Sequence, residues 1–141
     1  MLLDALKNFY LYSIRCKWMP GFPSNSIESI LAGEPLKIDW LKSDYKDRWF
    51  ADPFILDVTD EYIILLVEEV LLPGTHGNIA KLTIDKYTHK LLKSKVVLQL
   101  DTHLSFPAIY RDGDNIYIYP ENSASGDLNL YKYNSETECF E

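Results

Sequence analysis

The sequence has few of the residues that the more specialised chemistries require. Lys and Arg number only 14 against 21 Asp and Glu, so the 141-residue chain has a net charge of −7. Phosphate binding needs a basic surface, and this balance therefore excludes nucleic acid as a general partner. No apolar run approaches the roughly 20 residues of a membrane-spanning helix. Gly-rich phosphate loops and nucleophile elbows are absent from the sequence as well.

Cysteine and histidine are also scarce. Two thiols, Cys16 and Cys139, are too few for a disulfide scaffold and match no zinc spacing. His76, His89 and His103 are too scattered to indicate a metal site, and we expect His76 and His89 in solvated outer loops. We therefore expect unlinked thiols in a reducing compartment, no metal and no other cofactor. No signal peptide is recognisable at the N-terminus, so the expected location is cytoplasmic.

Aromatic and β-branched residues are abundant, and they favour strands. Aromatic residues make up 13% of the chain and include ten tyrosines. Past residue 45, short apolar runs alternate with polar turns and leave no room for a helix of normal length. The expected strands are 54–56, 62–67, 79–84, 91–100, 106–110, 116–119 and 128–133.

The first 45 residues have a mixed pattern. Apolar residues at helical spacing predict a short helix near the start, and alternation over 10–18 predicts a strand after it. Pro20, Gly21 and Pro23 predict a loop at 20–24. A helical turn is expected at 26–31 and a short strand at 36–40.

Two stretches of the chain resemble each other. They read ADPFILDVTDEYIILLVEE and SFPAIYRDGDNIYIYPE. Pro53 aligns with Pro107, and Glu68 aligns with Glu121. A four-stranded antiparallel meander repeated about every 50 residues is typical of a β-propeller blade. Two similar hairpins in a sandwich or a barrel are the alternative.

We therefore predict an all-β fold, a partial β-propeller of about two four-stranded antiparallel blades. Residues 1–45 form an N-terminal segment, 46–102 the first blade and 103–141 a second, incomplete blade. Separate blades would leave faces and edges uncovered. We therefore expect self-association, further blades, or cover from the N-terminal segment.

Three carboxylates are the candidate catalytic residues. Asp52 begins one strand, Glu68 ends the strand that returns to it, and Glu121 has the matching place in the second repeat. In a propeller the first strands line the axis, so these acids would surround one funnel. Two carboxylates in a partly dry cleft repel each other, so that one keeps a proton. Acid/base work at a glycosidic bond requires such a pair, although structural carboxylates at strand ends are also common.

Five further residues are candidates for binding a carbohydrate substrate or glycoconjugate. Arg48 could clamp a carboxylate or a hydroxyl, and Trp49 could stack on a sugar ring or instead fill space between blades. His103 could bind substrate or tune a neighbouring acid. Glu69 and Ser105 flank the same strand ends, where a solvated strand end explains Glu69 equally well.

Three segments carry a resemblance to a known family. They are WFADPF at 49–54, LLVEE at 65–69 and HLSFPAIYRDGDNIYIYPENS at 103–123. They resemble the propeller module N-terminal to the plant glucosamine inositolphosphorylceramide transferases, over about residues 36–134. That module is similar to the five-bladed propellers of glycoside hydrolase family 43 and its relatives, which include levansucrase and invertase.

The resemblance implies roles for particular residues. In those hydrolases an Asp beside an Asp-Pro element acts as base or nucleophile, which implies that role for Asp52. The second repeat departs from this pattern, because Phe106 replaces the acid. The blade that supplies the general acid in the hydrolases would lie after Glu141. The sequence therefore favours a hydrolase- or transferase-related protein that acts on a glycan, with a non-catalytic glycan-binding or protein-interaction module, or a truncated product without activity, as alternatives.

Overall fold

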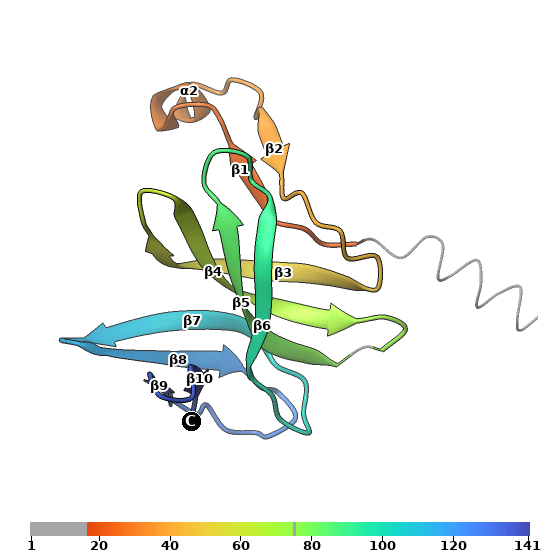
Figure 1. Ribbon diagram of the computed structural model, residues 1–141, viewed down its shortest axis with the longest axis vertical. Helices are drawn as coiled ribbons and strands as arrows, with labels where there is room; N and C mark the ends of the chain where they lie inside the picture. The colour runs from red at the N-terminus through yellow and green to blue at the C-terminus, as the bar shows by residue number, and fades with distance from the viewer. Residues whose placement is uncertain (1–16, 75) are drawn as a thin grey trace, which may run out of the picture.

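The computed structural model of the chain describes residues 17–74 and 76–141 (Figure 1). The helix and strand expected before residue 17 lie outside this part, as does Cys16, on which the expectation of unlinked thiols depends. Within it the chain is all-β, with one short helix near its beginning. The expected fold class is confirmed at this level.

The first sheet is an antiparallel meander in chain order. It consists of β3 (Arg48–Val58), β4 (Tyr62–Leu71), β5 (Gly77–Asp85) and β6 (Leu91–Leu98). All four strands were expected, and β3 and β4 are longer than their apolar runs alone indicated. The extra length comes from backbone pairing, which continues past the apolar residues to the polar ends of both strands.

The second sheet has the same order of strands. It consists of β7 (Ser105–Asp112), β8 (Asn115–Glu121), β9 (Tyr131–Asn134) and β10 (Cys139–Phe140). The Asp-Gly hairpin expected between β7 and β8 is present, with Gly113 at a φ of 55°. Strand β9 begins three residues later than expected.

The N-terminal segment forms a two-stranded ribbon and a helical turn. Strand β1 (Gly21–Pro23) pairs with β2 (Ile38–Trp40), and α2 (Ile27–Leu31) lies between them. The Ser26 hydroxyl accepts a hydrogen bond from the Ser29 N–H and caps the helix. The predicted loop at 20–24 is wrong, because a pairing partner far along the sequence converts its Pro- and Gly-rich residues into a strand.

The two sheets share an unusual bulge at the start of their first hairpin. The register of β3 on β4 shifts after Ala51, and that of β7 on β8 shifts after Ser105. Inside the bulges, Asp52 and Phe106 have φ values of 48° and 47°, and each precedes a proline. Left-handed backbone is rare outside glycine and asparagine. Its recurrence at aligned positions shows that the two stretches are copies of one structural unit.

The turns between the third and fourth strands repeat as well. The side-chain oxygens of Asp85 and Asn134 each accept hydrogen bonds from the backbone N–H groups two and three residues further on. His89 and Glu138, four residues further on, have φ values of 55° and 53°. These equivalences extend the repeat beyond the segments that the sequence comparison aligned most clearly.

Three layers are stacked along the long axis of the molecule: the β1–β2 ribbon, the first sheet and the second sheet (Figure 1). One face of the first sheet packs Leu66 and Ile79 against Leu104 and Ile118 from the second sheet and the connection before it. The opposite face is covered by the N-terminal segment. There Leu65, Val67 and Leu82 pack with Leu41, Met19 and Phe22.

His89 belongs to the contact between the ribbon and the first sheet. Its ring stacks on Phe22 with centroids 4.3 Å apart, and its Nδ1 lies 2.8 Å from Asp39 Oδ2. The expectation that His89 is a solvated loop residue is therefore wrong. The loop that carries it is pinned by the ribbon, an interaction that no local sequence signal reveals.

Candidate functional site

Asp52 lies in the bulge of β3, where the left-handed backbone turns its carboxylate toward the second sheet. Its Oδ2 accepts a hydrogen bond of 3.2 Å from the backbone N–H of Phe106. The ring of Phe106 in turn meets Phe54 edge to face, with centroids 4.8 Å apart. The two equivalent bulges therefore contact each other directly, and Asp52 holds them together.

Glu68 projects from β4 into the space between the sheets and is only 7% exposed. Its Oε1 lies 3.2 Å from His103 Nε2. On the other side of the same ring, Nδ1 accepts a 2.9 Å hydrogen bond from the backbone N–H of Gly77. Because Nδ1 accepts this bond, Nε2 is the ring nitrogen that can donate to Glu68.

Gly77 is the residue that permits this arrangement. A Cβ at this position would lie 2.8 Å from Glu68 Oε1 and would collide with the Leu104 carbonyl oxygen. That carbonyl belongs to the residue whose N–H donates a 2.9 Å bond to the Gly77 carbonyl. Only a residue without a side chain lets β5, Glu68 and the 103–104 connection approach this closely.

The environment of Glu68 favours its protonated form. Burial raises the pKa of the Glu68 carboxyl above its usual value; His103 opposes this rise, and the negative charge of Asp52 reinforces it. A raised carboxyl pKa is the direction of shift that a general acid needs.

Three of the predicted residues line an open pocket of about 520 Å³ at this end of the second sheet. His103, Ser105 and Glu121 share it with a loop after β8. The Ser105 hydroxyl lies 3.5 Å from Glu121 Oε2, as their opposite positions in the register dictate. The other lining residues, which the sequence did not single out, are Asn122, Ser123, Gly126, Asp127 and Leu128. They lie in the Ser- and Gly-rich loop between β8 and β9.

Arg48 and Glu69 lie away from this pocket. Successive side chains of a strand point to opposite faces, so Glu69 faces the N-terminal segment while Glu68 faces the second sheet. Glu69 is 1% exposed, and its Oε1 accepts hydrogen bonds from Arg48 Nη1 at 3.0 Å and from Ser94 Oγ at 3.3 Å. The structure therefore separates these two residues from the other candidates and joins them in a buried ion pair.

Trp49 is half-buried and lies opposite Val70, on the face of the first sheet that also carries Glu68.

His76 was expected to be a solvated loop residue, and this expectation is only partly correct. Its ring is exposed, but Nε2 lies 2.8 Å from the Asp101 carbonyl and the ring is 6.4 Å from that of His103.

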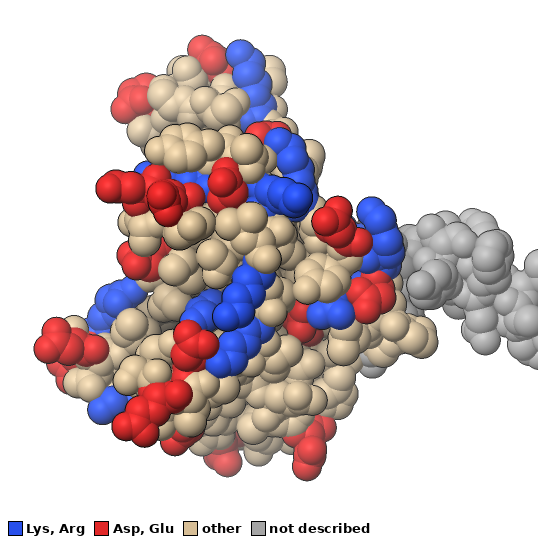
Figure 2. Space-filling model, in the orientation of Figure 1, with Lys and Arg blue, Asp and Glu red and all other residues tan. Residues whose placement is uncertain are grey.

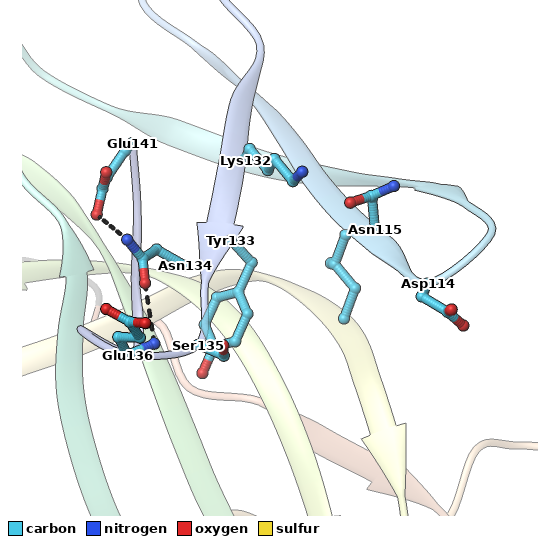
Figure 3. Close-up of a pocket in the computed structure, with 9 residues that line it drawn as sticks. Asp114, Asn115, Lys132, Tyr133, Asn134, Ser135, Glu136 and Glu141 are labelled. Atoms are coloured by element: carbon cyan, nitrogen blue, oxygen red, sulfur yellow. Dashed lines mark hydrogen bonds between the residues drawn. The ribbon is translucent and has the colours of Figure 1, made fainter.

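A second open pocket, of about 720 Å³, lies where β8 and β9 diverge near the β7–β8 turn (Figure 3). The side chain of Asn134 joins the residues on one side of this pocket. Its Nδ2 donates a 2.8 Å hydrogen bond to Glu141 Oε1, and its Oδ1 accepts one from the backbone N–H of Glu136 (Figure 3). None of the predicted site residues lines this pocket, which makes it a useful reference surface.

Charge is not concentrated as a polyanion-binding surface would require. Figure 2 shows acidic and basic groups interspersed over the visible face, with basic groups at several separate places. Two lysines, Lys81 and Lys95, both pair with Glu138, at 3.7 and 3.1 Å. Within residues 17–74 and 76–141 no helix is long and apolar enough to cross a bilayer. The same residues contain no group of His, Cys, Asp and Glu placed to hold a metal ion.

The fold and the site define an all-β module of two repeated four-stranded sheets, with buried and exposed acids where the sheets meet. The chain belongs to the family described as glucosamine inositolphosphorylceramide transferase 1, N-terminal, whose model matches residues 38–136. The resemblance to the N-terminal module of these transferases is confirmed, and the family relates the chain to a glycan-modifying transferase. Comparisons with curated proteins and with solved structures gave no significant match.

Proposed function

We propose that this chain is a propeller-type module that binds a glycan in the pocket formed by His103, Ser105 and Glu121. The observation that carries the proposal is the convergence of these three residues, picked out independently by the sequence repeat, on one open pocket. Family membership supports a carbohydrate as the ligand, because the family is named for a transferase of an amino sugar.

The arrangement of the sheets supports a propeller. The first strands, β3 and β7, lie against each other, and so do the last strands, β6 and β10. Two meanders stacked in the same orientation, first strand on first strand, are what neighbouring blades require. The similarity to five-bladed glycoside hydrolase propellers belongs to this proposal.

The pocket has the chemistry of a sugar site. Carboxylate, amide and hydroxyl groups of Glu121, Asn122 and Ser105 offer the paired donors and acceptors that sugar hydroxyls need. Leu128 is 75% exposed at the rim and offers an apolar surface to the ring face of a sugar. None of the lining residues is Lys or Arg, so anionic sugars are disfavoured relative to neutral or amine-bearing ones.

Binding to an array of immobilised glycans, followed by calorimetry with the best oligosaccharide, tests the proposal. Glu121→Gln replaces a charged acceptor oxygen by an amide donor, and Ser105→Ala removes the hydroxyl; each should weaken binding about tenfold. The matched control is Glu136→Gln in the other pocket (Figure 3), which should bind as the wild type does. Loss of binding in the control, or unchanged binding in both pocket variants, would refute the assignment.

Glycoside cleavage or transfer is a second candidate, favoured by the raised pKa of Glu68 beside Asp52. In this mechanism Glu68 donates its proton to the leaving oxygen of the glycosidic bond. A water or an acceptor hydroxyl attacks the anomeric carbon, and Asp52 takes up the proton of that attacking group. Glu68→Gln keeps the size and the acceptor of the side chain but removes that proton. It should abolish turnover of an activated aryl glycoside while leaving glycan binding intact. A wild-type chain that binds glycans yet cleaves none of a broad aryl glycoside panel would exclude catalysis by this chain.

A further inference from the structure

Among the residues that the structure describes, the stack of layers ends in two exposed apolar faces, one at each end. We call Tyr110, Tyr117 and Tyr119, on the outer side of the second sheet, the tyrosine face. Tyr110 and Tyr119 are 51% and 39% exposed. Tyr110 lies opposite Tyr117 in the register, and their rings are 6.1 Å apart. Lys132 lies over the ring of Tyr117 at one side of this face.

The repeat shows what the tyrosine face is equivalent to. Leu66 and Tyr119 each lie two residues before the equivalent glutamates, Glu68 and Glu121. Leu66 is fully buried because the second sheet packs on it. The tyrosine face is therefore the copy of a surface that, in the first sheet, is an established sheet-to-sheet interface.

The opposite end of the stack is the outer side of the β1–β2 ribbon. We call Trp18, Ile38 and Trp40 the tryptophan face. Ile38 and Trp40 lie on the side of β2 away from the first sheet, and the two tryptophans are 59% and 56% exposed. Trp18 and Trp40 line an apolar hollow of about 590 Å³. The ribbon covers the face of the first sheet on which another repeat sheet would pack. Its outer side is therefore the next surface along the stack of layers.

We propose that two copies of this chain associate head to tail, with the tyrosine face of one copy packed on the tryptophan face of the other. Both faces are aromatic and mostly uncharged, whereas each chain as a whole carries a charge of −7. Two copies that met through acidic surfaces would therefore repel each other, whereas contact through these two faces brings no like charges together. Heterologous faces of this kind close into a ring when the rotation permits and otherwise form open chains. This association does not depend on glycan binding.

Sedimentation velocity of the full chain over a wide concentration range tests the proposal. The wild type should associate, and Trp40→Asp or Tyr119→Asp should raise the dissociation constant about tenfold or more, because each buries an unpaired charge in the contact. Trp18→Asp and Tyr110→Asp serve as second variants on the two faces if either first variant unfolds. The control is Tyr87→Asp, at a residue 77% exposed in the β5–β6 turn and part of neither face.

Mixing the two variants tests the head-to-tail geometry. Trp40→Asp retains an intact tyrosine face and Tyr119→Asp an intact tryptophan face, so together they should form a pair that neither forms alone. A chain that stays monomeric at every concentration would overturn the proposal. So would association that survives Trp40→Asp, because the contact would then not use the tryptophan face.

Discussion

The carboxylate of Asp52 accepts a hydrogen bond from the backbone N–H of Phe106, its own counterpart in the second repeat. Asp52 was expected to act as a base or nucleophile, and its observed contact is with the protein itself. The contact joins the bulges of two sheets at the point where both adopt left-handed backbone. Any chemical role for Asp52 is therefore combined with a structural one, and substitutions must separate the two.

Substitutions of Asp52 can make that separation. Asn retains an acceptor and tolerates a positive φ, so Asp52→Asn should cost less than about 1 kcal/mol of unfolding free energy. Asp52→Ala loses the acceptor and keeps the backbone strain, and it should cost about 2 kcal/mol. Asp52→Gly loses the acceptor but relieves the strain, so it should fall between the two. Urea unfolding checks this order, and an Ala variant as stable as the wild type would contradict it.

Two glycines that align in the repeat should lose different amounts of stability on substitution. Gly77→Ala places a methyl against Glu68 and the Leu104 carbonyl, so it should cost about 2–3 kcal/mol or prevent folding. Gly126 has a φ of 75°, but a Cβ added there would meet no atom within 4 Å. Because Asn tolerates that φ, Gly126→Asn should cost less than about 1 kcal/mol. Thermal melts of both variants provide the measurement, and equal losses would contradict the distinction.

Much of the fold could be predicted from period-two alternation and the internal repeat. The opposition of Glu68 to the start of β3, and of Glu121 to Ser105, follows from turn position and antiparallel pairing alone. Pairing between distant segments could not be predicted in this way. Strand β1 exists only because β2 lies beside it, and no local pattern distinguishes its residues from a loop.

The candidate site, like the fold, could be predicted only in part from the sequence. Repeat alignment found Glu68, His103 and Glu121, which the structure places around one region. Without the strand register, the alignment could not show on which side of the sheet each side chain lies. Glu69 was therefore grouped with Glu68, although a one-residue step puts it on the opposite side of the sheet. The role of Gly77 depends on close packing of three segments, which leaves no signature in the sequence.

The stability of the protein should depend on pH through Glu68. Burial raises the pKa of this carboxyl above its value in the unfolded chain. Ionisation is therefore less favourable in the folded state, and the protein loses stability as the pH rises through the folded pKa. Below the unfolded value of about 4.3, both states are protonated and the loss is absent. The neutral variant Glu68→Gln should therefore gain stability relative to the wild type as the pH is raised from about 4 to 7.

Unfolding curves of both proteins at several pH values provide this measurement. Glu121→Gln is the control, because it removes an exposed carboxylate from the other hairpin of the repeat and should show no comparable pH-dependent gain. A constant stability difference between the wild type and Glu68→Gln across the range would show that burial does not penalise the Glu68 charge.

The buried pair of Arg48 and Glu69 should matter for folding and not for ligand binding. Arg48→Met leaves the 1% exposed Glu69 without its cation, and breaking such a pair from one side costs about 3–5 kcal/mol. Arg48→Met combined with Glu69→Gln removes the uncompensated charge and should recover a large part of the loss. Chemical denaturation of the single and double variants measures the recovery. Glycan affinity of the folded double variant should equal that of the wild type, because both residues face the N-terminal segment and neither lines the pocket of His103, Ser105 and Glu121. A double variant that folds but no longer binds would return Arg48 and Glu69 to the ligand site.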